Sequence, residues 1–115
     1  MGKSRKHILE KIIKELEGAQ AHPEDYDLNT LLSDITSATR QLRAYKSYSS
    51  GHQHLLALIS DSLEHTLNKY KVKPKTKQIG AIIDAFKYMK KEMITSYDLE
   101  HVASYFAKEK IFTIP

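Results

Sequence analysis

The sequence has no cysteine, which excludes a disulfide-stabilised scaffold and a thiolate metal site. Proline and glycine are also scarce, with three and four residues respectively, so few breaks interrupt the chain and long helices are expected. No apolar run approaches the roughly 20 residues that a membrane-spanning helix needs. The basic N-terminal stretch MGKSRKHILEKIIKELEG never reaches the uncharged apolar segment of a signal peptide, so we expect a cytoplasmic protein.

Motifs of known enzymes are missing as well. The chain has no Gly-rich phosphate loop, no nucleophile elbow and no Cys/His pair. Its carboxylates fall three or four residues from lysines, as in Glu10 with Lys14 and Asp84 with Lys87, which is typical of solvated pairs on a helix surface. We therefore expect a protein that is not an enzyme, with no catalytic residues and no cofactor.

Six histidines raise the question of a metal site. Asp61 and His65 are four residues apart, and Asp98 and His101 three apart, so each pair could share one helix face. A di-iron helical bundle uses two Glu-x-x-His motifs, however, and this sequence has none. We expect these side chains to be surface polar residues and predict no metal.

Four stretches carry apolar residues at spacings of three and four, which predicts four amphipathic helices. No stretch alternates with period two over a useful length, so no sheet is expected. Connections of modest length between the four stretches favour an all-α, antiparallel up-down four-helix bundle, formed as one domain over residues 1–115. The predicted core residues are Ile8, Leu9, Ile12, Ile13 and Leu16; Leu28, Leu31, Leu32, Ile35, Ala38, Leu42 and Tyr45; Leu55, Leu56, Ile59, Leu63, Leu67 and Tyr70; and Ile79, Ile82, Ile83, Phe86, Met89 and Met93.

Helix boundaries are predicted from capping residues. Ser4 is placed to cap the first helix, and Gly18 stands where a left-handed C-terminal cap belongs. The serine-rich stretch SYSSG is expected to end the second helix. Pro74 breaks the third pattern, because proline inside a helix costs about 3 kcal/mol.

The C-terminal stretch predicts a short fifth helix and a hydrophobic tail. Thr95 and Asp98 form a possible capping box for this helix, whose apolar residues are Leu99, Val102, Ala103 and Phe106. The tail KEKIFTIP either folds back onto the bundle or is held out for a partner. We expect partial docking: Ile111 and Phe112 pack into the groove beside the third and fourth helices, and Ile114 and Pro115 are less fixed.

The net charge of +4 is unevenly distributed. Residues 69–93 carry eight lysines against two carboxylates, and nine of these residues form the stretch KYKVKPKTK around Pro74. This basic corner is either a solvated surface, a patch for an anionic membrane surface or a nucleic-acid site. Arginine is scarce, which argues against base recognition in DNA, so we expect weak association with the inner membrane surface and no nucleic-acid partner.

The last fifty residues resemble the immunity proteins that protect bacteria from class IIa (pediocin-like) bacteriocins. A Tyr/Lys-rich stretch, LNKYKVKP, ends the third helix and an amphipathic fourth helix, QIGAIIDAFKYMKKEM, follows. A short charged helix then leads into a hydrophobic tail, EHVASYFAKEKIFTIP, in a layout similar to the carnobacteriocin-type members. The N-terminal half is similar in pattern alone.

The resemblance implies a four-helix bundle that acts inside the cell without catalysis. Its partner would be the membrane part of the mannose phosphotransferase system with bound bacteriocin, and selectivity would lie in the C-terminal half. Two other classes stay open: a small basic nucleic-acid-binding protein and a helical adaptor for another protein. The candidate partner-binding residues are Lys71, Lys73, Lys75, Lys87, Lys90, Lys91, Tyr105, Ile111, Phe112 and Ile114.

Overall fold

The computed structural model describes residues 4–67 and 74–111, and all regular structure within them is helical. The all-α prediction is therefore confirmed for this part of the chain. The elements are α1 (Arg5–Ala21), the short 3₁₀ helix η1 (Pro23–Asp25), α2 (Leu28–Arg43), α3 (Ser50–His65), α4 (Thr76–Tyr88) and α5 (Ser96–Lys108).

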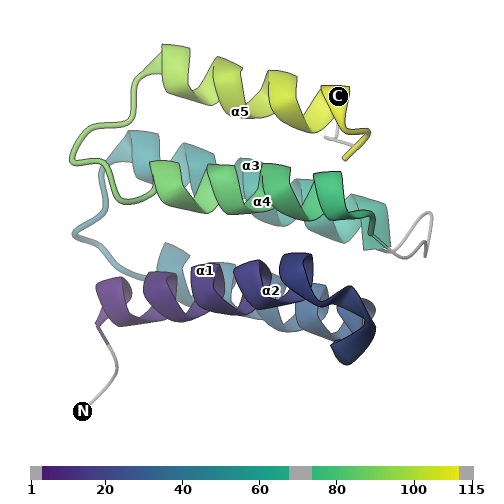
Figure 1. Ribbon diagram of the computed structural model, residues 1–115. Coiled ribbons are helices and arrows are strands. Elements are labelled where there is room, and N and C mark those ends of the chain that lie inside the picture. The colour runs from purple at the N-terminus through teal and green to yellow at the C-terminus, as the bar shows by residue number, and fades with distance from the viewer. Residues whose placement is uncertain (1–3, 68–73, 112–115) are drawn as a thin grey trace.

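Successive helices run in alternating directions, as Figure 1 shows. The most extensive packing joins α1 to α4 and α2 to α3, which gives the four-helix arrangement expected of an up-down bundle. Helix α5 forms a further layer that packs against α4 and, to a smaller extent, against α3. The expected antiparallel bundle with an appended fifth helix is thus present.

The N-cap side chain accepts a hydrogen bond from the first turn in α1, α2, α3 and α5, but not in α4. Ser4 Oγ accepts a hydrogen bond from the backbone N–H of His7 at 3.2 Å, as predicted. At α5, Thr95 Oγ1 accepts from the Asp98 N–H at 3.1 Å, and Asp98 Oδ2 accepts from the Thr95 N–H at 3.0 Å. This reciprocal pair is the predicted capping box, and it satisfies two backbone donors that a helix start leaves without partners.

Two glycines lie in close contacts with other parts of the chain. Gly18 is not a C-terminal cap: α1 continues to Ala21, and none of the described glycines has a positive φ. A Cβ atom at Gly18 would lie 2.3 Å from the hydroxyl oxygen of Tyr26, so the glycine makes room for that ring. Gly51 is inside α3, where a Cβ atom would lie 2.5 Å from the Ile94 carbonyl oxygen.

The core consists largely of the predicted apolar stripes. Met93 is an exception: it is 71% exposed, because α4 ends at Tyr88 and Met93 belongs to the connection that follows. Tyr70 lies outside the described residues. The largest fully buried side chains are Phe86, Phe106, Leu16, Ile35, Leu42, Leu55, Leu56, Ile59, Leu63, Ile79, Ile82 and Met89.

Candidate functional site

The structure separates the predicted lysines along α4. Lys75 immediately precedes the helix, while Lys90 and Lys91 follow its last residue. Since α4 has 13 residues, its two ends are about 20 Å apart at 1.5 Å per residue. Lys71 and Lys73 lie outside the described residues. Of the predicted partner-binding lysines that the structure describes, Lys75 therefore lies at one end of the bundle, and Lys90 and Lys91 lie at the other.

Two of these lysines have acidic partners. Lys87 Nζ lies 3.9 Å from Glu17 Oε2 on α1, and both side chains are more than half exposed. Lys91 Nζ donates to Asp98 Oδ2 at 2.8 Å, and the Asp98 side chain is 8% exposed. The hydrogen bond from Lys91 lowers the pKa of Asp98 below its ordinary 3.8. The hydrogen bond from the Thr95 backbone adds a smaller effect in the same direction. The Asp98 carboxylate thus joins the start of α5 to the end of α4.

The predicted Tyr105 is half-buried on α5, in a row of rings along the seam between α4 and α5. Its ring meets the His101 ring edge-on at 6.4 Å between centroids, and His101 lies 5.3 Å from the Tyr88 ring. His101 Nε2 is 3.3 Å from Asp84 Oδ2 on α4. Packing against α4 limits the part of Tyr105 that a partner could reach.

Ile111 is buried, with 2% exposure, as the predicted docking of the tail required. The chain reverses at Lys110, whose φ of 61° lies in the left-handed region. The Ile111 N–H then donates to the Phe106 carbonyl at 2.8 Å, and the Lys110 N–H to the Ala107 carbonyl at 3.1 Å. These two bonds define a Schellman motif, in which the residue after the turn packs back on the helix. Phe112 and Ile114 lie outside the described residues.

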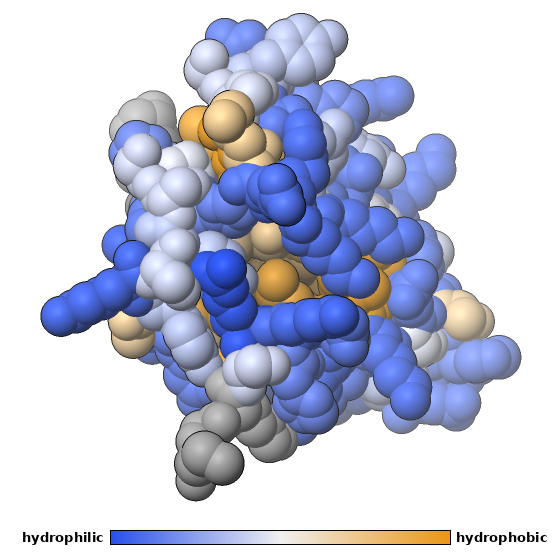
Figure 2. All heavy atoms as spheres, turned by 90° about the vertical axis from the view of Figure 1, so that its left-hand side faces the viewer, coloured by the Kyte–Doolittle hydropathy of each residue, from blue (hydrophilic) through white to orange (hydrophobic). Residues whose placement is uncertain are grey.

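A pocket of about 370 Å³ lies at the end of the bundle where α1 and α3 begin and α4 ends. Figure 2 shows this end of the molecule, with hydrophobic atoms visible at the bottom of a hollow rimmed by hydrophilic side chains. We call it the end pocket. Its lining residues are Arg5, Lys6, Leu9, Glu10, Ser47, Tyr48, Ser49, His52, Met89, Lys90, Lys91 and Glu92.

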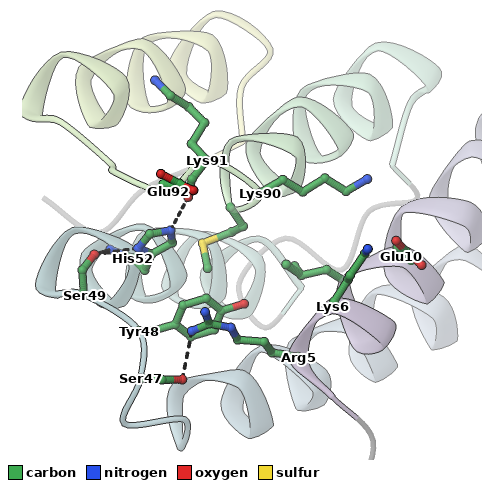
Figure 3. A pocket seen from close by; sticks show the side chains of 12 residues that line it. Arg5, Lys6, Glu10, Ser47, Tyr48, Ser49, His52, Lys90, Lys91 and Glu92 are labelled. Carbon is green, nitrogen blue, oxygen red and sulfur yellow. Dashed lines mark hydrogen bonds between the residues drawn. The ribbon is translucent and has the colours of Figure 1, made fainter.

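Tyr48 lies within the end pocket, between Arg5 and His52 (Figure 3). The Arg5 guanidinium lies 4.4 Å from the Tyr48 ring centroid and donates a hydrogen bond to Ser47 Oγ at 2.9 Å. The Tyr48 hydroxyl is buried and has no hydrogen-bond partner among the described residues. Burial raises the pKa of Tyr48 above its ordinary 10.0, and the nearby Arg5 charge opposes this with a smaller effect. The hydroxyl thus stays protonated and can donate.

His52 forms the opposite wall of the end pocket. Its Nε2 is 2.7 Å from the Lys91 carbonyl oxygen, and its Nδ1 is 2.6 Å from Ser49 Oγ. Because a carbonyl oxygen can only accept, Nε2 carries a proton and its N–H donates a hydrogen bond to the Lys91 carbonyl. The imidazole also stacks on Tyr48 at 5.1 Å between centroids. His52 therefore joins the start of α3 to the residues that follow α4, a role that its position in the sequence did not reveal.

Sequence reasoning placed Lys90 and Lys91 among the functional candidates but missed their neighbours in the end pocket. Those neighbours come from residues 5–10 and 47–52, which no local motif connects with residues 89–92. One further group, His22, Glu24 and Asp25 at η1, has ligand atoms within 4.8 Å of one another, but all three residues are exposed. No helix in the described part of the chain combines the length and the apolar character needed to cross a membrane.

No protein-family model, no curated protein and no solved structure is significantly similar to this chain.

Proposed function

We propose that this chain is an immunity protein against a pediocin-like bacteriocin. In this proposal it binds the toxin-loaded mannose phosphotransferase receptor from the cytoplasmic side of the membrane and performs no catalysis. It needs no metal or other cofactor for this role, because its action is binding through a surface of the bundle. The layout of the last fifty residues gave the resemblance, and the docking of α5 is the observation that carries the proposal.

Helix α5 offers a surface suited to a partner. It is a complete 13-residue helix that buries Val102 and Phe106 against the bundle and leaves its outer face in solvent. An isolated helix of that length is marginal in water, so packing on α4 and α3 keeps it folded. The bundle therefore acts as a rigid support for the C-terminal region, where the resemblance places selectivity.

Exposed hydrophobic side chains are found beside the start of α5. Met93 is 71% exposed and Tyr97 is 78% exposed, and they are the most exposed large hydrophobic side chains in residues 4–67 and 74–111. They are only four residues apart in the chain. Exposed apolar side chains favour a protein contact where they form one contiguous patch, and we propose that these two do so. We include both side chains in the proposed receptor-binding surface.

The test is to express the gene in a sensitive strain and to challenge the cells with a panel of pediocin-like bacteriocins. We expect growth to be restored against at least one member. The Met93→Ser/Tyr97→Ser double variant should stay folded but lose protection. Lys14→Ala/Gln41→Ala, which changes exposed positions on α1 and α2, is the matched control and should protect fully.

Two truncations separate the tail from the bundle. A chain that ends after Ile111 keeps the buried isoleucine, whereas one that ends after Lys110 loses it. We expect both truncated proteins to lose protection, but only the shorter one to lose substantial stability. Failure of the full chain to protect against any bacteriocin of the panel, despite folded protein in the cells, would overturn the proposal. Tight binding to duplex DNA at physiological salt would favour a nucleic-acid function instead.

A further inference from the structure

The end pocket contains hydrogen-bond donors suited to an oxyanion. The buried Tyr48 hydroxyl has no partner in the described residues, and a buried hydroxyl without one costs free energy. The Arg5 guanidinium lies above the same ring and donates a hydrogen bond to Ser47. This bond uses one of the five N–H groups of the guanidinium. Arg5 is a long side chain with several rotatable bonds, so it can adjust to an anion that also meets the hydroxyl.

The electrostatic surroundings favour negative charge at the Arg5 side of the end pocket. Both α1 and α3 begin there, and the N-terminus of a helix carries partial positive charge. Lys6 and Lys90 add charge at the rim, while the Lys91 ammonium is directed to Asp98. The end of α4 and the carboxylates of Glu10 and Glu92 oppose this field. The side chain that lies over the Tyr48 ring is nevertheless the cationic Arg5 guanidinium.

The floor of the end pocket is apolar. Leu9 and Met89 line it and are 4% and 2% exposed over the whole residue, and hydrophobic atoms are visible at the bottom of the hollow in Figure 2. A volume of about 370 Å³ lies at the lower end of the range for small-molecule sites. Leu9 and Met89 are themselves almost fully buried, but the accessible wall of the pocket as a whole is more apolar than polar. An inorganic anion would leave that apolar surface uncovered, whereas an anion joined to an apolar group would cover it.

We propose that the end pocket binds an organic phosphate, that is, a phosphate group joined to a small apolar moiety. The phosphate oxygens accept hydrogen bonds from Arg5 and the Tyr48 hydroxyl, with Lys6 and Lys90 adding charge at the rim. The apolar moiety lies against Leu9 and Met89. Phosphate suits this donor set because a guanidinium presents its N–H groups as a planar fork that matches phosphate geometry.

Such a group has two sources: the headgroup of an anionic phospholipid or a soluble phosphate ester. The first test uses phenyl phosphate, added to the full chain and followed through the backbone amide signals in two-dimensional NMR spectra. Saturable shifts should concentrate at residues 5–9, 47–52 and 89–92. Inorganic phosphate should bind at least tenfold more weakly, since it lacks the apolar part. Equal affinity for the two probes, or no saturable binding of phenyl phosphate, would overturn the proposal.

Charge variants distinguish the end pocket from a general attraction to a basic protein. Lys6→Gln/Lys90→Gln removes two charges from the rim, and we expect about tenfold weaker binding. Lys77→Gln/Lys108→Gln removes two exposed charges near the start of α4 and the end of α5, at the other end of the bundle, and should change the affinity less than twofold. Equal losses in the two double variants would mean that binding is not localised and would sink the assignment.

Tyr48→Phe removes only the hydroxyl oxygen. Because that oxygen has no partner in the described residues, the variant should unfold at the same or a higher temperature. Its affinity for phenyl phosphate should nonetheless fall about tenfold. Arg5→Gln should weaken binding as well. Unchanged affinity in Tyr48→Phe would contradict the proposed geometry, whatever its stability.

Vesicles then separate the two sources. A phospholipid headgroup would be assigned if the protein sediments with phosphatidylglycerol vesicles but not with phosphatidylcholine vesicles. Tyr48→Phe should then weaken that sedimentation. Binding of phenyl phosphate without vesicle binding would assign it to a soluble ester. The proposed site would be overturned if the protein does not bind phenyl phosphate and none of the variants changes its binding to vesicles. None of these measurements depends on bacteriocin protection, so this inference and the proposed function can each fail alone.

Discussion

The two ends of α5 are held in place by different kinds of interaction. At its start, Thr95 and Asp98 exchange hydrogen bonds with each other's backbone, and Lys91 pairs with the same carboxylate at 2.8 Å. At its end no glycine is available for the turn, so Lys110 adopts a φ of 61° and Ile111 becomes buried. The start follows local preferences of the sequence, whereas the end goes against one.

The magnitudes explain how the unfavourable turn persists. A left-handed conformation costs a non-glycine residue about 1–2 kcal/mol. Complete burial of an isoleucine side chain gains about 1.5–3 kcal/mol, and the two hydrogen bonds of the Schellman motif add to this. The burial of Ile111 therefore offsets the strain at Lys110. A cap of the Thr95 type contributes about 1 kcal/mol and needs no such compensation.

The largest effect is expected from Ile111→Ala. Removing this buried side chain should lower the free energy of unfolding by about 2–4 kcal/mol, since it leaves a cavity and takes away the contact that stabilises the turn. Urea unfolding of the variant measures the loss. The control is Tyr97→Ala, at a site that is 78% exposed, which should change stability by less than about 0.5 kcal/mol. A loss at Ile111 no larger than at Tyr97 would show that the tail does not stabilise the end of α5.

Gly51→Ala tests the contact immediately before the start of α5. The added Cβ atom would lie 2.5 Å from the Ile94 carbonyl oxygen, and this backbone atom cannot rotate away. We expect a loss of about 1–3 kcal/mol in thermal or urea unfolding. In Gly18→Ala the nearest atom is the hydroxyl at the end of the Tyr26 side chain, which can move, so the loss should be smaller. The reverse order would contradict this account of the two glycines.

Asp98→Asn probes the charge at the start of α5. Hydrogen bonds from Lys91 and Thr95 lower the pKa of the folded protein's Asp98 below 3.8, so its ionised form stabilises the fold. That contribution is complete above pH 3.8 and is lost as the pH falls through the lowered pKa. The stability difference between the parent and the variant should therefore shrink below about pH 4. A difference that stays constant from pH 7 to pH 2 would exclude this role.

The smallest effect in this series is an expected gain, in Lys110→Gly. Glycine adopts positive φ without a Cβ clash, so the variant should gain about 0.5–1 kcal/mol in the free energy of unfolding. Lys110→Ala keeps the Cβ atom and removes only an exposed side chain, and it should leave stability unchanged. Equal stabilities of the two variants in urea unfolding would mean that the turn carries no strain.

Much of the fold could be predicted because its signals are local. Apolar residues at spacings of three and four identify the buried faces, and Ser4 and Thr95 cap helices within one turn of their own positions. Two predictions about helix ends failed. Gly18 was expected to end α1, but it accommodates Tyr26, and Met93 continued an apolar pattern beyond the last residue of α4.

The sequence by itself determined the helices, their alternation and the apolar faces that join them, since these follow from interactions within four residues and from short connections. Only the tertiary structure decided the candidate sites. The end pocket joins residues 5–10, 47–52 and 89–92, which become neighbours when α1, α3 and α4 pack. The burial of Ile111 was expected from the apolar tail, but the left-handed turn at Lys110 that permits it was not. The end pocket and this turn both depend on surfaces that separate elements form together, and no local pattern in the chain encodes them.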